Sequence, residues 1–239
     1  MINFGFIIDS LNGGGAERVV LNLANKLVDQ GHVVHIFILK NEIDYNFDKD
    51  KLSLHIISNS GKVHSIKFFN KRRLAKLLLK KIKEQNISFD LFVSNLEASD
   101  EVSKIAKLNN LYHCINGVIS EFIENKYKNT SGIKHFRRKF KYYLKTKSQY
   151  DNTKLIASSQ GVADDLIRFG IKPKSLTVIH NGFNFDEIRN NASKEAIEED
   201  DYIICVGRFA EGKCHELLIE AYKKSKIKEK LIFLGTTDK

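Results

Sequence analysis

The sequence predicts a doubly wound α/β fold, in which helices flank a parallel sheet. Short apolar runs typical of strands alternate with amphipathic helical patterns along the whole chain, the order that builds such sheets. The first run, Ile2 to Ile8, is of the kind expected for a strand buried on both faces of a parallel sheet. The chain has 239 residues, 42% of them hydrophobic, so it is long enough for one large domain or two small ones.

Local signals define where strands and helices begin and end. A helix that begins after Ser158 or Ser159, either of which can cap it, is expected to carry Asp164 and Asp165 in its first turn and to end at Gly170. Strands are expected near residues 2–8, 33–39, 54–57, 89–94, 111–115, 154–157, 176–179, 202–206 and 230–234.

Three consecutive glycines, Gly13–Gly15, follow the first strand and precede an amphipathic helix that stops at Gly31. Glycines at such a turn let the backbone come close to a ligand. The alternative is a tight strand-to-helix turn that binds nothing. The loop is not a nicotinamide fingerprint, because Arg18 stands where that pattern needs glycine, and it is not a P-loop, because no Gly-Lys-Ser/Thr follows.

A second candidate site follows the strand near 202–206. Arg208 and Lys213 lie between this strand and a helix expected over Cys214 to Lys224. Two fixed cations beside the amino end of a helix, which adds partial positive charge and free N–H groups, suit a diphosphate. The alternative is an ordinary strand-to-helix loop with a surface arginine and lysine.

These stretches resemble the retaining glycosyltransferases of the family 4 type, which have a two-domain GT-B fold. The similarity is carried by VGRFAEGK, by GGAER, by SSQGVADDLIRFGI with VIHNG, and by LYHCINGVIS, and it extends from Ile2 to about Gly235. It implies a Rossmann-like acceptor-side domain, followed by a second Rossmann-like domain that binds a nucleotide sugar.

The resemblance also implies roles for individual residues. Arg208 and Lys213 would hold the donor diphosphate, and Gly14 and Gly15 would face the cleft near the donor phosphates and the acceptor. No metal and no cofactor beyond the nucleotide-diphosphate-sugar donor are implied, since the two cations would do the work of a divalent ion.

Related enzymes often place a histidine just past the strand near 111–115, close to the reacting sugar. In this chain Asn116 stands at that position, with His113 three residues earlier. Asparagine can hydrogen-bond a sugar hydroxyl but cannot act as an acid or base. His113 is therefore the second candidate catalytic residue, and the alternative is a satisfied histidine inside the strand.

The family fold implies three parts. Residues 1–185 are expected to form the acceptor-side domain, 186–201 a polar linker, and 202–239 the first strand–helix–strand of the donor domain. Such a short unit buries too little apolar surface to be stable alone. We therefore expect a chain truncated within the donor domain, before the glutamates that bind the donor in this family.

The net charge of +10 is concentrated in two segments. Lys67–Lys83 contains eight basic residues and Lys126–Lys147 contains nine, and neither contains Asp or Glu. Both are amphipathic, which suits an anionic membrane surface. The alternative for each is a core-facing helix with a solvated basic face, and nucleic acid is a weaker candidate because no nucleic-acid motif is present.

Other features restrict the class of protein. The sequence has three cysteines without a C-x-x-C pair and histidines without metal-ligand spacing, which indicates neither disulfides nor zinc. We see no signal peptide or membrane-spanning run and expect a cytoplasmic protein, peripheral on the inner face of the membrane.

Three functions remain as hypotheses. The first is a glycosyltransferase that moves a sugar onto a cell-envelope glycan or glycolipid, as in lipopolysaccharide or polysaccharide synthesis. The second is a catalytically incomplete binding module that docks on an anionic membrane or a partner subunit. The third is a sugar-phosphate or nucleotide-binding α/β protein of another class.

Overall fold

The computed structural model describes residues 1–48, 50–59, 69–193 and 201–236. The chain divides into two compact units, Met1–Phe183 and Asn184–Lys239, and each is described by itself.

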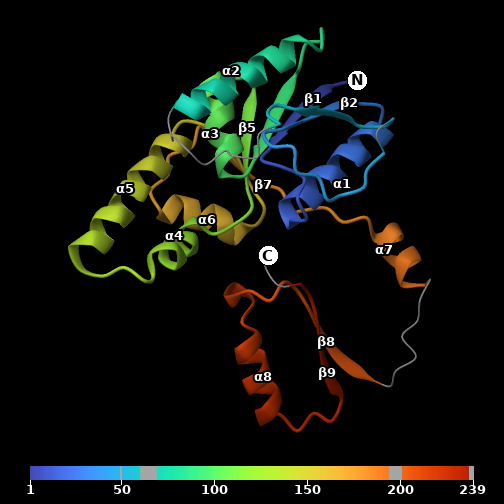
Figure 1. Cartoon of the computed structure of the whole chain (residues 1–239), viewed down its shortest axis with the longest axis vertical. Helices are drawn as coiled ribbons and strands as arrows, with labels where there is room; N and C mark the ends of the chain where they lie inside the picture. Colours follow the sequence, from blue (N-terminus) through green and yellow to red (C-terminus); the bar gives the residue numbers. More distant parts are fainter. Residues whose placement is uncertain (49, 60–68, 194–200, 237–239) are drawn as a thin grey trace. The chain divides into compact units, whose positions relative to one another are not determined.

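The first unit contains a sheet of seven parallel strands in the order β3-β2-β1-β4-β5-β6-β7 (Figure 1). All seven strands expected in this part of the chain are present, within two residues of their expected bounds. They are β1 (Asn3–Ile8), β2 (Val33–Ile38), β3 (Ser53–Ile56), β4 (Leu91–Asn95), β5 (Leu111–Ile115), β6 (Lys154–Ala157) and β7 (Ser175–Val178). The α/β class with a parallel sheet is thereby confirmed.

In the described part of the first unit, six helices flank this sheet. Strand β1 shows why the first apolar run is needed. Phe6 and Ile8 pack in a core with one helix, whereas Ile7 points to the opposite face and packs with two others. Both faces of the strand are therefore buried, as the apolar run predicts. The helices are α1 (Gly15–Asp29), α2 (Phe69–Lys83), α3 (Glu97–Ala106), α4 (Ile119–Tyr127), α5 (Gly132–Tyr150) and α6 (Gln160–Arg168).

Helix α2 contains most of the first basic segment, and its apolar face is buried. Leu74 and Leu78 are 3% and 0% exposed and belong to the core that Ile7 enters. For the described residues of this segment, the core-facing alternative is confirmed. Lys67 and Phe68 lie outside the described residues.

The second unit is a short strand–helix–strand preceded by an additional helix. Strands β8 (Tyr202–Val206) and β9 (Lys230–Leu234) pair in parallel, and α8 (His215–Lys224) connects them after a 3₁₀ helix (Glu211–Lys213). The residues expected as a polar linker include helix α7 (Phe185–Ala192), which Asn184 caps by accepting the N–H of Glu187. This local cap favours a helix where sequence composition alone indicated a linker.

A pair of histidines joins β2 to β3 within the first unit. Nδ1 of His35 lies 2.8 Å from Nε2 of His55, and the two rings stack with their centroids 5.0 Å apart. Burial lowers the pKa of both rings. For His55, repulsion by His35 and Lys81 adds to burial and outweighs Glu84, so that its pKa falls to about 4.

The histidine pair predicts that stability decreases as the pH falls from about 6.5 to about 4. In this window the histidines of the unfolded chain bind protons more readily than the folded pair does, so the free energy of unfolding decreases. The contribution of the neutral pair to stability is complete above about pH 6.5 and is lost as the pH falls toward about 4. Urea unfolding at about pH 7 and pH 4.5 measures the loss. His55→Phe keeps an aromatic ring but cannot titrate, so it is expected to lose less; an equal loss in both proteins contradicts the prediction.

Candidate active site

The candidate site lies where the strand order of the sheet reverses, between β1 and β4. In open α/β sheets, ligands bind outside the carboxyl ends of the strands at such a point. Here the glycine loop follows β1, and Leu96 connects β4 to α3. Strand β5 pairs in parallel with β4, so the loop after β5, which contains Asn116, lies at the same edge of the sheet.

The glycine loop packs its backbone tightly against the start of α1. Gly13 has a φ of +55°, and Gly14 occupies the N-cap position of α1. A Cβ on Gly14 would stand 2.2 Å from a carboxylate oxygen of Glu17, so only glycine fits without a shift of that side chain. The Tyr45 hydroxyl donates to the Gly14 carbonyl at 2.9 Å, which fixes the loop.

The two glycines proposed to face a ligand have different surroundings. Nothing lies within 4 Å of the place where a Cβ on Gly15 would stand, so this backbone is open to approach. At Gly14 the carboxylate of Glu17 already lies against the first turn of α1, where a negative charge is favourable. An incoming phosphate at Gly14 would have to displace that carboxylate.

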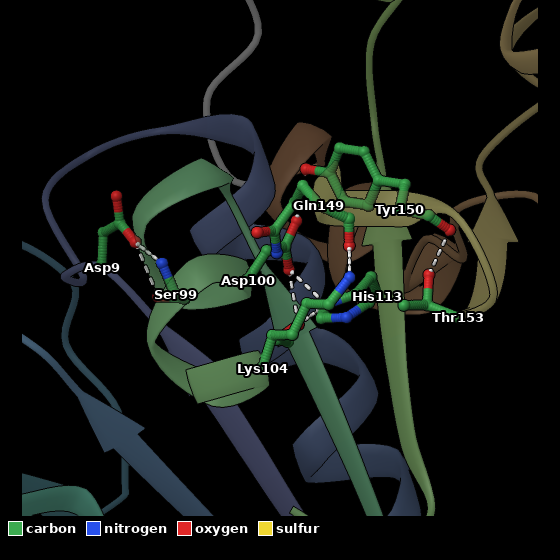
Figure 2. A network of polar contacts seen from close by, with 9 residues as sticks. Asp9, Ser99, Asp100, Lys104, His113, Gln149, Tyr150 and Thr153 are labelled. Carbon is green, nitrogen blue, oxygen red and sulfur yellow. Dashed lines mark hydrogen bonds and ion pairs between the residues drawn. The ribbon is translucent and has the colours of Figure 1, made fainter. Parts of the chain in front are cut away.

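Asp9, directly after β1, is a candidate site residue that the sequence reasoning missed. Its Oδ1 accepts hydrogen bonds from the backbone N–H and the hydroxyl of Ser99, at 2.8 and 2.6 Å (Figure 2). Burial raises the pKa of Asp9, although the bonds from Ser99 oppose the shift. The available signal was a carboxylate directly after a buried strand, at the edge where ligands bind.

His113 lies inside the unit, where it is 1% exposed. Its Nδ1 lies 2.7 Å from the Ser94 hydroxyl and 3.2 Å from Oδ1 of Asp100, whose other oxygen accepts the Tyr150 hydroxyl at 2.8 Å (Figure 2). A ring so buried cannot touch a reacting sugar. The geometry therefore favours the alternative for His113, a satisfied histidine that joins β5 to α3 and α5.

Asn116 is partly exposed in the loop after β5. Its Nδ2 is buried and has no hydrogen-bond partner among the described residues, and Cys114 Sγ lies 3.9 Å from its Oδ1. Burial raises the pKa of the Cys114 thiol to about 11, so this cysteine is no nucleophile at neutral pH. Asn116 thus keeps an unused donor at the edge of the sheet.

Asp165 holds the other end of this loop. It is 4% exposed and accepts the N–H groups of Ile119 and Ser120, at 2.8 and 3.2 Å, together with the Ser120 hydroxyl. It therefore caps α4, whose own N-cap residue Val118 makes no side-chain cap. The expectation that Asp164 and Asp165 lie in the first turn of their own helix is wrong, because α6 begins at Gln160. Ser159 caps α6, as predicted.

Arg208 and Lys213 lie at the carboxyl end of β8, in the second unit, and both are exposed. Gly207, which directly follows β8, donates its N–H to the carbonyl of Leu234 at 2.9 Å. The Lys213 side chain returns toward this strand end, because its Cδ lies 3.7 Å from the place of a Cβ on Gly207. Two cations thus stand at one strand end, and α8 begins two residues after Lys213.

Among the residues that the structure describes, no group of three or more His, Cys, Asp or Glu side chains is arranged to hold a metal ion.

The fold and the site agree with a known family. Residues 13–187, more than half of the chain, match the model of Glycosyltransferase Family 4, and the chain belongs to this family. One curated relative is the N-acetylgalactosamine-N,N'-diacetylbacillosaminyl-diphospho-undecaprenol 4-alpha-N-acetylgalactosaminyltransferase of Campylobacter jejuni. It is 28% identical over 239 residues, which cover 98% of this chain and 63% of the relative. The chain therefore spans less than two thirds of that relative.

Solved structures show the same fold. Sucrose-phosphate synthase from Thermosynechococcus elongatus matches with a TM-score of 0.64 and 18% identity, over 100% of this chain and 63% of that chain. WaaG, a glycosyltransferase involved in lipopolysaccharide biosynthesis, matches with a TM-score of 0.60 and 16% identity, over 98% of this chain and 64% of that chain. At these identities the likeness concerns the fold alone, and it supports the expected GT-B class.

Proposed function

We propose that this protein transfers a sugar from a nucleotide-diphosphate donor to a glycan or lipid-linked acceptor of the cell envelope, with retention of anomeric configuration. The observation that carries the proposal is the match of residues 13–187 to Glycosyltransferase Family 4. The curated relative, whose name specifies a diphospho-undecaprenol acceptor, supports a lipid-linked acceptor in particular.

In the proposed reaction, Arg208 and Lys213 bind the donor diphosphate. Its negative charge increases as the bond to the sugar breaks, and two fixed cations stabilise that charge without a metal ion. Within the first unit, the open backbone at Gly15 and the amino end of α1 are suited to contact a phosphate. Asn116 is partly exposed in the loop after β5, and an amide at this edge of the sheet is suited to hydrogen-bond a hydroxyl of the reacting sugar.

Calorimetric titration with uridine, guanosine and adenosine diphosphates tests the donor half of the proposal. We expect one of the three to bind, with an affinity that falls as salt is added, because the contact is between charges. Arg208→Ala should weaken that binding. Failure of all three diphosphates to bind the folded protein would oppose the proposal.

A second candidate function, docking on an anionic membrane, is favoured by helix α5. Three of its apolar side chains do not face the core: Ile133, Phe136 and Phe140 are 80%, 70% and 51% exposed. Lys134, Arg137, Arg138 and Lys141 line the adjacent basic surface. Exposed apolar groups beside cations are typical of helices that lie on a membrane surface. Within the described ranges, no helix is sufficiently long and apolar to cross a bilayer.

The triple replacement of Arg137, Arg138 and Lys141 by Glu is expected to abolish most sedimentation with vesicles that contain phosphatidylserine. Each cation near such a surface contributes about 1 kcal/mol, and the new carboxylates are repelled. The matched control is Arg73, Lys76 and Lys80 to Glu on α2, which changes the same charge at exposed positions where the apolar face is buried. Equal sedimentation of the two variants contradicts docking through α5.

A further inference from the structure

A cavity of about 250 Å³ lies within the first unit, at the carboxyl ends of β4 and β5. Leu96 and Gly117, which follow these two strands, form part of its wall, and helices α3, α4 and α5 supply the rest. The side chains that matter below are Glu97, Glu101, Phe122, Tyr142, Lys145 and Gln149. None of them belongs to the proposed donor site.

Charges in the cavity nearly cancel. Glu97 pairs with Lys145 and accepts the Tyr142 hydroxyl at 3.0 Å, while Glu101 pairs with Lys145 at 2.5 Å and with Lys71. Burial opposes the ionisation of Glu97, but Lys145 and the Tyr142 hydroxyl lower its pKa. Glu97 is thus held ionised as a hydrogen-bond acceptor, and the two carboxylates disfavour a phosphate or carboxylate ligand beside them. The cavity suits a neutral ligand that donates hydrogen bonds.

One polar group in the wall lacks a partner. Gln149 is 9% exposed, and its Nε2 makes no hydrogen bond among the described residues. A buried donor without a partner lowers stability, because its lost hydrogen bond to water is not replaced, and a ligand oxygen would restore that bond. Leu96 adds a second sign of function, because its φ of 76° and ψ of 153° lie in a region that is almost restricted to glycine.

The apolar part of the cavity is aromatic. The rings of Phe122 and Tyr142 lie with their centroids 6.0 Å apart, and Phe122 is 50% exposed. Sugar rings combine hydroxyl groups at their edge with C–H groups on their faces, so they match a wall of carboxylates and aromatic rings. The volume is below the roughly 300–1,000 Å³ of sites for drug-sized molecules, which favours a single ring.

We propose that this cavity binds one neutral sugar ring of the acceptor, with its hydroxyls donating to Glu97 and Glu101 and an oxygen accepting from Gln149. The inference rests on the proposed function, since it assigns the acceptor. That oxygen is a ring hydroxyl or an acetamido carbonyl, both of which accept from an amide N–H.

Saturation-transfer NMR without donor tests the cavity, with methyl glycosides of hexoses and N-acetylhexosamines as probes and methyl glucuronide as the anionic comparison. We expect a neutral glycoside to bind and the glucuronide to bind less. Gln149→Met, which keeps the length but removes the donor, should weaken binding about tenfold. Phe122→Ala, at an exposed position where folding is not at risk, should weaken it several-fold. Gln160→Met, at an exposed position of α6 outside the cavity, should not weaken it.

The cavity proposal is overturned if no neutral glycoside binds, if the glucuronide binds better, or if Gln149→Met and Phe122→Ala both bind like the parent. Titration with nucleoside diphosphates separates this result from the proposed function. Diphosphate binding without glycoside binding removes the acceptor cavity and leaves the transferase proposal. Glycoside binding that responds to both variants, without diphosphate binding, supports the cavity and opposes the donor half of the proposed function.

Discussion

In the full-length protein, replacing Arg208 or Lys213 by alanine is expected to lower kcat/KM for sugar transfer about 100- to 1,000-fold. Both side chains are exposed at the carboxyl end of β8, so the protein should remain folded. The negative charge of the diphosphate increases as the sugar leaves, so its contacts with the two cations strengthen in the transition state. Loss of such contacts lowers kcat as well as raising KM. Steady-state kinetics with varied donor measures both constants.

Lys228→Ala is the matched control for these two variants. Lys228 is an exposed lysine of the same unit, in the loop between α8 and β9, and its loss changes the net charge equally. It should leave kcat/KM unchanged. If Arg208→Ala and Lys213→Ala retain activity like that control, neither cation binds the diphosphate.

Asp100→Ala is expected to cause a large loss of stability, about 3 kcal/mol or more in the free energy of unfolding. Asp100 is 1% exposed and accepts hydrogen bonds from Ser94 and Tyr150 and contacts His113. Its removal leaves three buried polar groups without their common acceptor. Urea unfolding at neutral pH measures the change.

Asp164→Ala provides the comparison for Asp100→Ala. Asp164 is an exposed carboxylate on α6 that accepts a surface hydrogen bond from Gln160. Its loss should cost less than about 0.5 kcal/mol. Tyr150→Phe, which removes one donor to Asp100, should fall between the two. If Asp100→Ala costs no more than Asp164→Ala, the buried network does not stabilise the fold.

Sequence patterns were sufficient for the elements because those patterns are local. The strands and the Ser159 cap depend on residues a few positions apart, and the apolar run at β1 requires burial on two faces. The glycine loop was likewise visible, since Gly13 needs a positive φ. The donor-site cations Arg208 and Lys213 could be proposed from their spacing at the end of one strand.

The rest of the site depends on contacts between distant segments, which no local pattern encodes. Asp165 caps a helix that begins 46 residues earlier, and Tyr150 bonds to Asp100 across 50 residues. A signal did exist for Asp165, because it lies on the same helical face as the buried Val162 and Leu166. An acid within an apolar stripe indicates a buried partner but does not identify it.

The two basic segments show the same limit. Both are amphipathic in sequence, yet α2 buries its leucines and α5 exposes Phe136 and Phe140. Which face is covered depends on neighbouring elements, and periodicity within one helix does not contain that information. The structure was therefore needed to make α5, and not α2, the candidate membrane surface.

The most direct test of the central claim follows a single transfer reaction by NMR. The protein is incubated with uridine-, guanosine- and adenosine-diphosphate sugars and a short polyprenyl-diphosphate glycan as acceptor. We predict release of one nucleoside diphosphate together with a new glycosidic signal of the same anomeric configuration as the donor. A product of inverted configuration, or no transfer from any donor by protein that also fails to bind the diphosphates, would contradict the account.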